Sequence, residues 1–278
     1  MGKLTLMSLP IGNLEDLTIR IKEVLFKESH FIVEDTRSFK YMLQHLGIDS
    51  HQKKVESYHD QSEEGKLEYL VNQLKKGIHY FLISEAGSPI ISDPAYPLVK
   101  RCYEENIMVE TYPGPSSVIA GIEISGLPPF PFHFYGFFPR DNHDQLNKLN
   151  NLSTIAGLHI FFESPHRIKE SIINIKKTLP SVKLVVIKEL TKTFQARYDL
   201  SDENTWESIF QKIDERGEFL MLFYIEASSG ISQLKWNEIK SLAVSVMASK
   251  GKKKDLSKLL GEILEQSPKE IYQLLNDI

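Results

Sequence analysis

The sequence predicts an α/β protein with two consecutive α/β domains and a small helical C-terminal extension. The chain has 278 residues, which is enough for two domains of ordinary size. Short apolar strands alternate with amphipathic helices, which is typical of βαβ units and a parallel sheet. A segment rich in Pro and Gly, residues 112–117, separates two such alternating regions. We therefore predict an N-terminal domain over residues 1–113, a second domain over 114–228 and a helical extension over 229–278.

The first alternating region begins with a strand that ends in a turn. After it, Leu14, Ile21 and Leu25 recur at helical spacing and predict one continuous helix over residues 14–29. Gly47 is a plausible stop for the next helix, because glycine is common just beyond a helix end. Strands are predicted within residues 3–13, 30–36, 54–59, 78–84 and 107–114, and helices within 14–29, 38–47, 63–77 and 97–106.

The second alternating region is followed by a linker and a helical tail. Residues 227–233 have the composition of a linker, and residues 236–278 follow a helical pattern. Within the tail, Ser267 and Pro268 are a suitable helix start. Strands are predicted within residues 132–140, 157–164, 182–190 and 218–226, a helix within 166–179, and a basic cluster at Lys250, Lys252, Lys253 and Lys254.

Composition and missing motifs exclude several classes of function. The net charge of -4 argues against a protein that coats nucleic acid nonspecifically, although one basic face is still possible. A single cysteine, Cys102, excludes an intramolecular disulfide and a cysteine-built metal site. The sequence has no run long enough for a membrane span and no signal peptide, so we expect a cytoplasmic protein without a membrane partner. It also lacks the phosphate-loop, dinucleotide, hydrolase and zinc-protease motifs, so we expect no catalytic metal.

Four polar loops follow predicted strands and are the candidate site. They are residues 10–13 (PIGN), 34–37 (EDTR), 85–89 (EAGSP) and 163–167 (ESPHR). Ligands of open α/β sheets bind beyond the carboxyl ends of the strands, where such loops converge. A single loop of this kind is more often plain turn chemistry, whereas several on one edge indicate a binding site.

Taken together, these loops resemble the bacterial ribosomal RNA small-subunit methyltransferase I family, whose members have the tetrapyrrole-methylase fold. The similarity covers about residues 4–226, and the helical tail is also similar to the C-terminal extension of that family. Departures from the family pattern lie mainly at Glu85, Ser88, Ile90 and Ala95, with Lys188 in place of an arginine. The matching motifs, in order, are SLPIGNLEDLTIR, IVEDTR, SEAGSPIISDPAYPLV, YPGPSSVIAGIEISGLP, YGFFPR, FFESPHR, KELTK and RGEF.

The resemblance implies an enzyme that uses S-adenosylmethionine to methylate the ribose 2′-hydroxyl of a cytidine in small-subunit ribosomal RNA. It further implies a cofactor held in the cleft between the two domains, the small ribosomal subunit as partner, and a homodimer. Carried over by motif, the cofactor-binding positions are Pro10, Gly12, Ala86, Gly87, Ser88, Ile91, Ser116, Ser117, Glu163 and Lys188.

A ribose hydroxyl is a weak nucleophile, so a general base or a polarising contact is expected. The candidates are Asp35, Glu163 and Lys188. Each also has a structural interpretation: Asp35 could pair with Arg37, Glu163 could cap a helix, and Lys188 could be solvated. For contacts with RNA phosphates we expect Arg37, His166 and Arg167, and the basic cluster of the tail is either a further contact or a solvated loop.

Two other functions remain open at the level of sequence. One is methylation of a tetrapyrrole, although the G-x-G-P-G-D opening and G-G-D-P loop of those enzymes are absent. The other is a degenerate relative that binds RNA or a ribosome without methylating it. Ile90 and Ala95 motivate that idea, because each stands where the family has glycine and removes backbone freedom.

Overall fold

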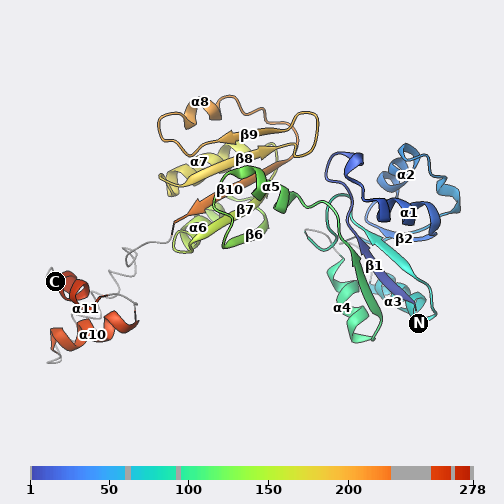
Figure 1. Cartoon of the computed structure of the whole chain (residues 1–278), viewed down its shortest axis with the longest axis horizontal. Coiled ribbons are helices and arrows are strands. Elements are labelled where there is room, and N and C mark those ends of the chain that lie inside the picture. The colour runs from blue at the N-terminus through green and yellow to red at the C-terminus, as the bar shows by residue number, and fades with distance from the viewer. Residues whose placement is uncertain (1, 60–63, 92–94, 227–251, 264–266, 276–278) are drawn as a thin grey trace. The chain divides into compact units, whose positions relative to one another are not determined.

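The computed structural model describes residues 2–59, 64–91, 95–226, 252–263 and 267–275 (Figure 1). The chain divides into two compact units, each described by itself below. One unit comprises Met1–Leu149 and Gly157–Tyr224, and the other Asn150–Ala156 and Ile225–Ile278. In the described part of the chain, no helix is long and apolar enough to cross a membrane. The predicted boundary near residue 113 falls inside the first unit and stays a prediction.

The first unit contains two five-stranded sheets, and the first of them is parallel throughout. Its strand order is β3-β2-β4-β1-β5, so β4 is central and all the carboxyl ends meet at one edge. Three of the four predicted polar loops, residues 10–13, 34–37 and 85–89, follow strands of this sheet and lie at this edge. The fourth, residues 163–167, follows a strand of the second sheet. The strands of the first sheet are β1 (Lys3–Met7), β2 (His30–Val33), β3 (Lys54–Ser57), β4 (Tyr80–Ile83) and β5 (Met108–Tyr112).

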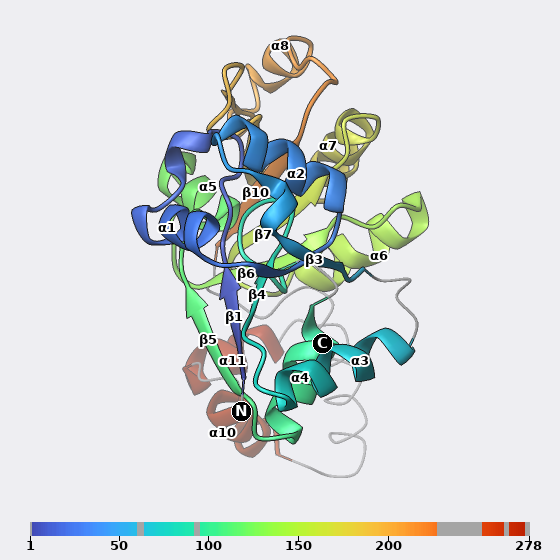
Figure 2. The ribbon, with the colours of Figure 1, turned by 90° about the vertical axis from the view of Figure 1, so that its right-hand side faces the viewer.

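Helices cover both faces of this sheet, as Figure 2 shows. Alternation along β2 places Phe31 and Val33 in one core and Ile32 in the other, because successive strand residues point to opposite faces. Strands buried on both faces are apolar without a break, which is the pattern that predicted them. The first core packs against α1 (Ile19–Lys27) and α2 (Thr36–His45), and the second against α3 (Glu64–Lys75) and α4 (Tyr96–Glu104).

The continuous helix predicted over residues 14–29 is wrong. The structure has a short 3-10 helix, η1 (Leu14–Asp16), followed by a break and then α1. The break occurs at Thr18, whose extended backbone lets its hydroxyl accept a hydrogen bond from the Ile21 N–H. The predicted stop at Gly47 is consistent with its φ of 70°, and a second 3-10 helix, η2 (Ser50–Gln52), follows.

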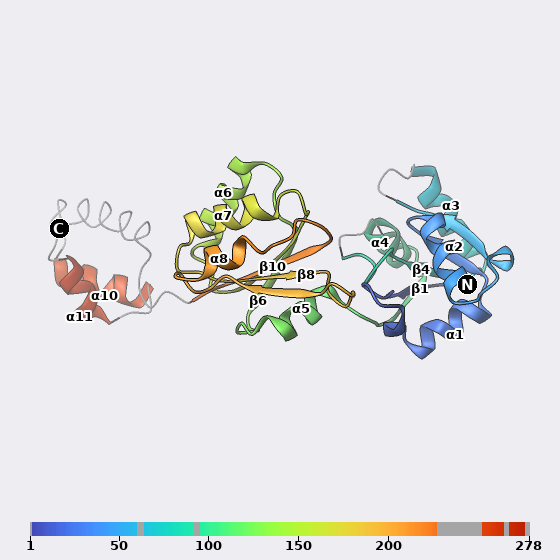
Figure 3. The ribbon, with the colours of Figure 1, turned by 90° about the horizontal axis from the view of Figure 1, so that it is seen from above.

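The second sheet is mixed, with strand order β6-β7-β10-β8-β9. β6 and β7 are parallel, whereas β8 is antiparallel to both β10 and β9. Figure 3 shows α6 and α7 on one face and α5 on the other. The sequence had not predicted α5, α6, β9 or α8. The elements are α5 (Ser117–Ser125), β6 (Phe132–Phe137), α6 (Asn142–Leu152), β7 (Gly157–Glu163), α7 (Ile168–Thr178), β8 (Lys183–Lys188), β9 (Ala196–Asp199), α8 (Trp206–Phe210) and β10 (Phe219–Ile225).

Among its described residues, the second unit contains the helices α10 (Lys253–Ile263) and α11 (Pro268–Leu274). Ser267 is the N-cap residue of α11 and Pro268 follows it, which confirms the helix start predicted there. Ile271 and Leu275 are buried, so this small unit has an apolar interior of its own. The predicted linker at 227–233 and Lys250 of the basic cluster lie outside the described residues.

Candidate functional site

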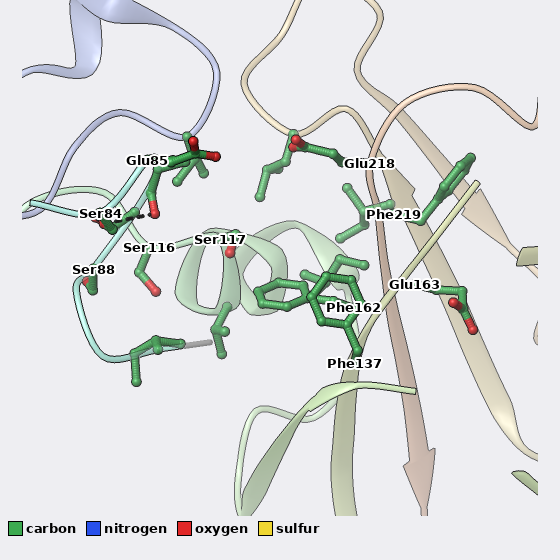
Figure 4. Close-up of a pocket in the computed structure, with 18 of the residues that line it drawn as sticks. Ser84, Glu85, Ser88, Ser116, Ser117, Phe137, Phe162, Glu163, Glu218 and Phe219 are labelled. Carbon is green, nitrogen blue, oxygen red and sulfur yellow. Dashed lines mark hydrogen bonds between the residues drawn. The ribbon is translucent and has the colours of Figure 1, made fainter. Parts of the chain in front are cut away.

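A pocket of about 370 Å³ lies within the first unit, where loops from the two sheets meet (Figure 4). Its volume is in the range of small-molecule sites, roughly 300–1,000 Å³. Its lining residues come from the ends of β1, β2 and β4, the start of α5, and strands of the second sheet. They are Ile11, Glu34, Ser84, Glu85, Ala86, Gly87, Ser88, Ile91, Ser116, Ser117, Val118, Phe137, Phe162, Glu163, Ile187, Leu190, Glu218, Phe219 and Leu220.

The loop after the central strand β4 is held in a fixed shape. The Ser84 hydroxyl donates hydrogen bonds to the carbonyl oxygens of Ala86 and Gly87, at 3.2 and 3.0 Å. Gly87 also exchanges two backbone hydrogen bonds with Leu9 of the β1 loop, at 2.9 and 3.0 Å. The φ of Gly87 is +68°, a conformation that favours glycine because it has no Cβ. The two loops therefore form one rigid rim of the pocket.

The two departures from glycine in the following segment have different consequences. Ile90 adopts a φ of 79°, which is strained for a β-branched residue. Its side chain is partly buried and packs against the core beneath α3 and α4. Ala95 is 1% exposed and has an ordinary φ of -71°, so its methyl group fits the site without strain. The loop keeps the backbone shape that glycine would allow, at the cost of strain at one residue.

The opposite side of the pocket offers backbone donors and apolar surface. Ser116 precedes α5 and its side chain does not cap the helix, so the first N–H groups of α5 are free of a side-chain cap. Such groups suit a carboxylate or another acceptor of a ligand. Phe137, Phe162 and Leu220 supply apolar surface on which a flat aromatic ring can pack.

The charged side chains in the pocket lining are all acidic. Among its lining residues are the carboxylates of Glu34, Glu85, Glu163 and Glu218, and no lysine, arginine or histidine. Such a lining suits a cationic ligand and opposes a phosphate-bearing one. A sulfonium cofactor with an amino-acid end and a flat base fits this combination of carboxylates, helix N–H groups and aromatic rings. In the described part of the chain, no cluster of three or more potential ligands could hold a metal ion.

Seven of the ten predicted cofactor positions line this pocket, and three do not. Pro10 is buried beside Ile11, which takes its place in the lining. Gly12 lies against the loop after β8, where an added Cβ would come within 2.5 Å of the Lys192 side chain. Lys188 is the third. The positions in the lining are Ala86, Gly87, Ser88, Ile91, Ser116, Ser117 and Glu163.

Glu163 is fully engaged by neighbouring side-chain and backbone groups. One carboxylate oxygen accepts from the Ser164 N–H at 2.7 Å and pairs with the Arg167 guanidinium at 2.6 Å. The other accepts from the Ser171 hydroxyl at 2.6 Å. Figure 4 shows the carboxylate directed away from the pocket serines. This geometry favours a structural role in which Glu163 fixes the start of α7. The same contacts occupy the Arg167 guanidinium, which the sequence predicts to bind RNA.

Lys188 points away from the pocket because of strand alternation. Its neighbour Ile187 faces the pocket, so the Lys188 side chain lies on the other face of the sheet. There its ammonium group forms an ion pair of 2.9 Å with Asp214. Hydrogen bonds from Arg216 and Lys188 lower the pKa of Asp214 to about 2. A lysine held this way is not placed to take a proton from a ligand in the pocket.

Asp35, Arg37 and His166 lie near the pocket's loops but outside its lining. Asp35 is the N-cap residue of α2, and its carboxylate accepts from the backbone N–H groups of Arg37 and Ser38 at 2.5 and 3.2 Å. Its contact with Arg37 therefore runs through the backbone and not the guanidinium. The side chains of Arg37 and His166 are exposed, as a contact with RNA requires. Their roles stay predictions.

Sequence reasoning missed several residues that line the pocket. Glu85 lies inside a motif that was recognised, but its side chain had not been considered. Phe137, Phe162 and Ile187 lie in predicted strands, and only the pairing of those strands shows that they face the pocket. Glu218 follows the Arg-Gly turn of a matched motif, which was the one signal that could have drawn attention to it.

Comparison with known proteins gives the family. The model of the Tetrapyrrole (Corrin/Porphyrin) Methylases matches residues 3–202. A Vibrio cholerae protein named ribosomal RNA small subunit methyltransferase I is 35% identical over 95% of this chain and 91% of its own length. The chain belongs to the tetrapyrrole methylase family. A Streptococcus pyogenes protein of the same name is 30% identical over 100% of this chain and 96% of its own length.

Two solved structures share the fold of this chain. A diphthine synthase has a TM-score of 0.62 at 14% identity, covering 81% of this chain and 90% of that one. The methyltransferase CobJ has a TM-score of 0.58 at 13% identity, covering 84% and 98%. These findings confirm the resemblance and fold class predicted from the motifs. The family match and the named relatives confirm the predicted class of enzyme, a methyltransferase dependent on S-adenosylmethionine.

Proposed function

We propose that this methyltransferase transfers a methyl group to the ribose 2′-hydroxyl of a cytidine in small-subunit ribosomal RNA. The observation that carries the proposal is the acidic pocket at the carboxyl edge of the first sheet. It is supported by relatives that are 30–37% identical and named for small-subunit ribosomal RNA. The motifs PIGN, EDTR, ESPHR and KELTK point to the same acceptor.

The chain's main task in this reaction is alignment. When bound, the cofactor supplies an electrophilic methyl group on a positively charged sulfur. The rigid rim of Gly87 and Leu9 fixes one side of the ligand, and the start of α5 fixes the other through its backbone N–H groups. Holding donor and acceptor in line removes much of the entropic cost of a bimolecular step. Phe137 and Phe162 offer apolar surface on which the base of the cofactor can pack.

We further propose that Arg37 and His166 contact RNA phosphates beside the pocket, since both side chains are exposed and follow strands whose ends line it. The pocket lining itself carries no basic side chain. The polyanionic acceptor therefore needs cationic groups outside the pocket, and the basic residues at the start of α10 are a further candidate contact. The small ribosomal subunit in the cytoplasm is the proposed partner.

A homodimer and the division into domains at 113 and 228 are also proposals. Phe130 and Phe132 precede and begin the edge strand β6, and are 76% and 39% exposed. Exposed apolar side chains gathered at one sheet edge mark an interaction surface, which a second copy of the chain would cover. Sedimentation of the full chain tests this, and a purely monomeric protein contradicts it.

The proposed activity is tested by transfer of labelled methyl groups from S-adenosylmethionine to small subunits. Subunits are purified from cells that lack this gene and from cells that have it. We expect label to enter only the former, and to appear as a 2′-O-methylated nucleoside after digestion. The absence of transfer to any subunit, ribosomal RNA or fragment would overturn the proposal, and methylation of uroporphyrinogen instead would favour a tetrapyrrole acceptor.

A further inference from the structure

Four carboxylates line the pocket, and not all of them are engaged by other groups of the protein. Glu163 is engaged by Ser164, Arg167 and Ser171. Glu218 pairs with Lys192 at 2.9 Å, and Glu34 is not free either. These three carboxylates are therefore not available to accept a proton without losing a contact.

Glu85 differs from the other three. Within the described residues its carboxylate has neither a hydrogen bond nor an ion pair, and its side chain is exposed. Figure 4 shows the carboxylate extending from the β4 loop toward the side of the pocket where Glu218 lies. A free carboxylate in a binding pocket can accept a hydrogen bond from a hydroxyl group of a ligand.

The backbone that carries Glu85 is fixed on both sides. It follows Ser84, whose hydroxyl bonds to Ala86 and Gly87 within the same loop. The loop in turn is bonded to Leu9. β4 is the central strand of its sheet, so the loop rests on the most rigid element of the first sheet. A catalytic group must be held close to its productive position, and sites that rest on strands achieve this better than free loops.

We propose that Glu85 is the proton acceptor for the ribose hydroxyl, an inference that rests on the proposed function. It replaces Asp35, Glu163 and Lys188 in that role, because each of them is engaged or points elsewhere. The ribose oxygen forms a bond to the methyl carbon as the carbon–sulfur bond breaks and its electron pair stays on sulfur. The hydroxyl proton passes to a Glu85 carboxylate oxygen and from there to water, which reaches this exposed side chain.

The test compares Glu85→Gln, Glu85→Asp and Glu85→Ala with the wild type and with Glu104→Gln. Glu104 lies on the surface of α4 with its side chain 51% exposed. Glu104→Gln is therefore a matched control that also removes one negative charge. Methyl transfer to unmodified small subunits is measured at saturating RNA and donor. Donor binding is measured separately by calorimetry, and thermal melting checks the fold.

We expect Glu85→Gln to lower kcat by about 100-fold, the usual contribution of a general base, while the donor Kd changes by less than about threefold. Glu85→Asp should keep more activity than Glu85→Gln, and added acetate should restore part of the activity of Glu85→Ala. Glu104→Gln should match the wild type. A kcat for Glu85→Gln within about threefold of the wild type would overturn the assignment of Glu85 but not the proposed function. A wild type that methylates no RNA would overturn the proposed function and this inference with it.

Discussion

Replacing Arg167 with methionine separates a structural role from a contact with RNA. The Arg167 guanidinium lies 2.6 Å from the Glu163 carboxylate, whose side chain is 0% exposed, whereas that of Arg167 is 20% exposed. Methionine keeps most of the apolar packing but removes the charge. The buried carboxylate then keeps only its hydrogen bonds from Ser164 and Ser171.

The cost follows from this burial. Removing one partner of a fully buried ion pair lowers stability by about 3–5 kcal/mol, because a charge is left without compensation. Water reaches the exposed fifth of Arg167, so we expect a smaller loss in the free energy of unfolding, about 2–3 kcal/mol. For a chain of this size that corresponds to a decrease in Tm of roughly 5–10 °C.

Urea denaturation and thermal melting of the full chain measure this effect. Arg37→Met is the control, because that side chain is exposed and a surface change is usually within about 0.5 kcal/mol. Adding Glu163→Gln to Arg167→Met should recover at least about 1 kcal/mol, since the buried charge is then gone. An Arg167→Met protein as stable as Arg37→Met would refute the structural role.

Three further predictions concern the pocket loop and the core. Gly87→Ala should weaken donor binding and lower the free energy of unfolding by about 1–2 kcal/mol, because φ is +68° and the new Cβ would lie 3.4 Å from Ile11 Cγ2. Calorimetry and denaturation curves that match those of the wild type would contradict this prediction. Ile90→Gly should be more stable than Ile90→Ala, because both lose the packing of the side chain but only glycine relieves the strain at a φ of 79°; equal urea midpoints would argue against strain. Burial raises the pKa of the Cys102 thiol to about 11, so iodoacetamide at pH 8 should modify the unfolded chain but not the native one. Because the folded pKa is raised above 9.0, the associated stability is present below pH 9 and is lost as the pH rises toward 11.

The sequence identified the loops of the site well but not the directions of their side chains. Gly87, Ser88, Ser116 and Ser117 belong to motifs, because a backbone that approaches a ligand closely requires small residues such as glycine and serine. Lys188 belongs to a motif too, yet strand alternation turns it to the far face and leaves Ile187 in the pocket. That distinction depends on which face of the second sheet is covered by α5, a helix that the sequence did not reveal.

The fold was predictable where one pattern governed a whole element. β4 is apolar throughout because both of its faces are buried, and its position was predicted correctly. The break before α1 was missed because Leu14 and Leu17 continue the helical spacing of the residues that follow. The hydrogen bond from the Ile21 N–H to the Thr18 hydroxyl stabilises a helix start at this point, in competition with a helix that continues through it. The apolar spacing alone does not show which conformation forms.

Mass mapping of small-subunit ribosomal RNA from cells with and without this gene tests the central claim most directly. We predict that one cytidine loses a single methyl group, carried on its ribose, when the gene is absent. Restoring the wild-type chain should restore the mark, and restoring Glu85→Gln should not. Identical methylation maps with and without the gene would contradict the account.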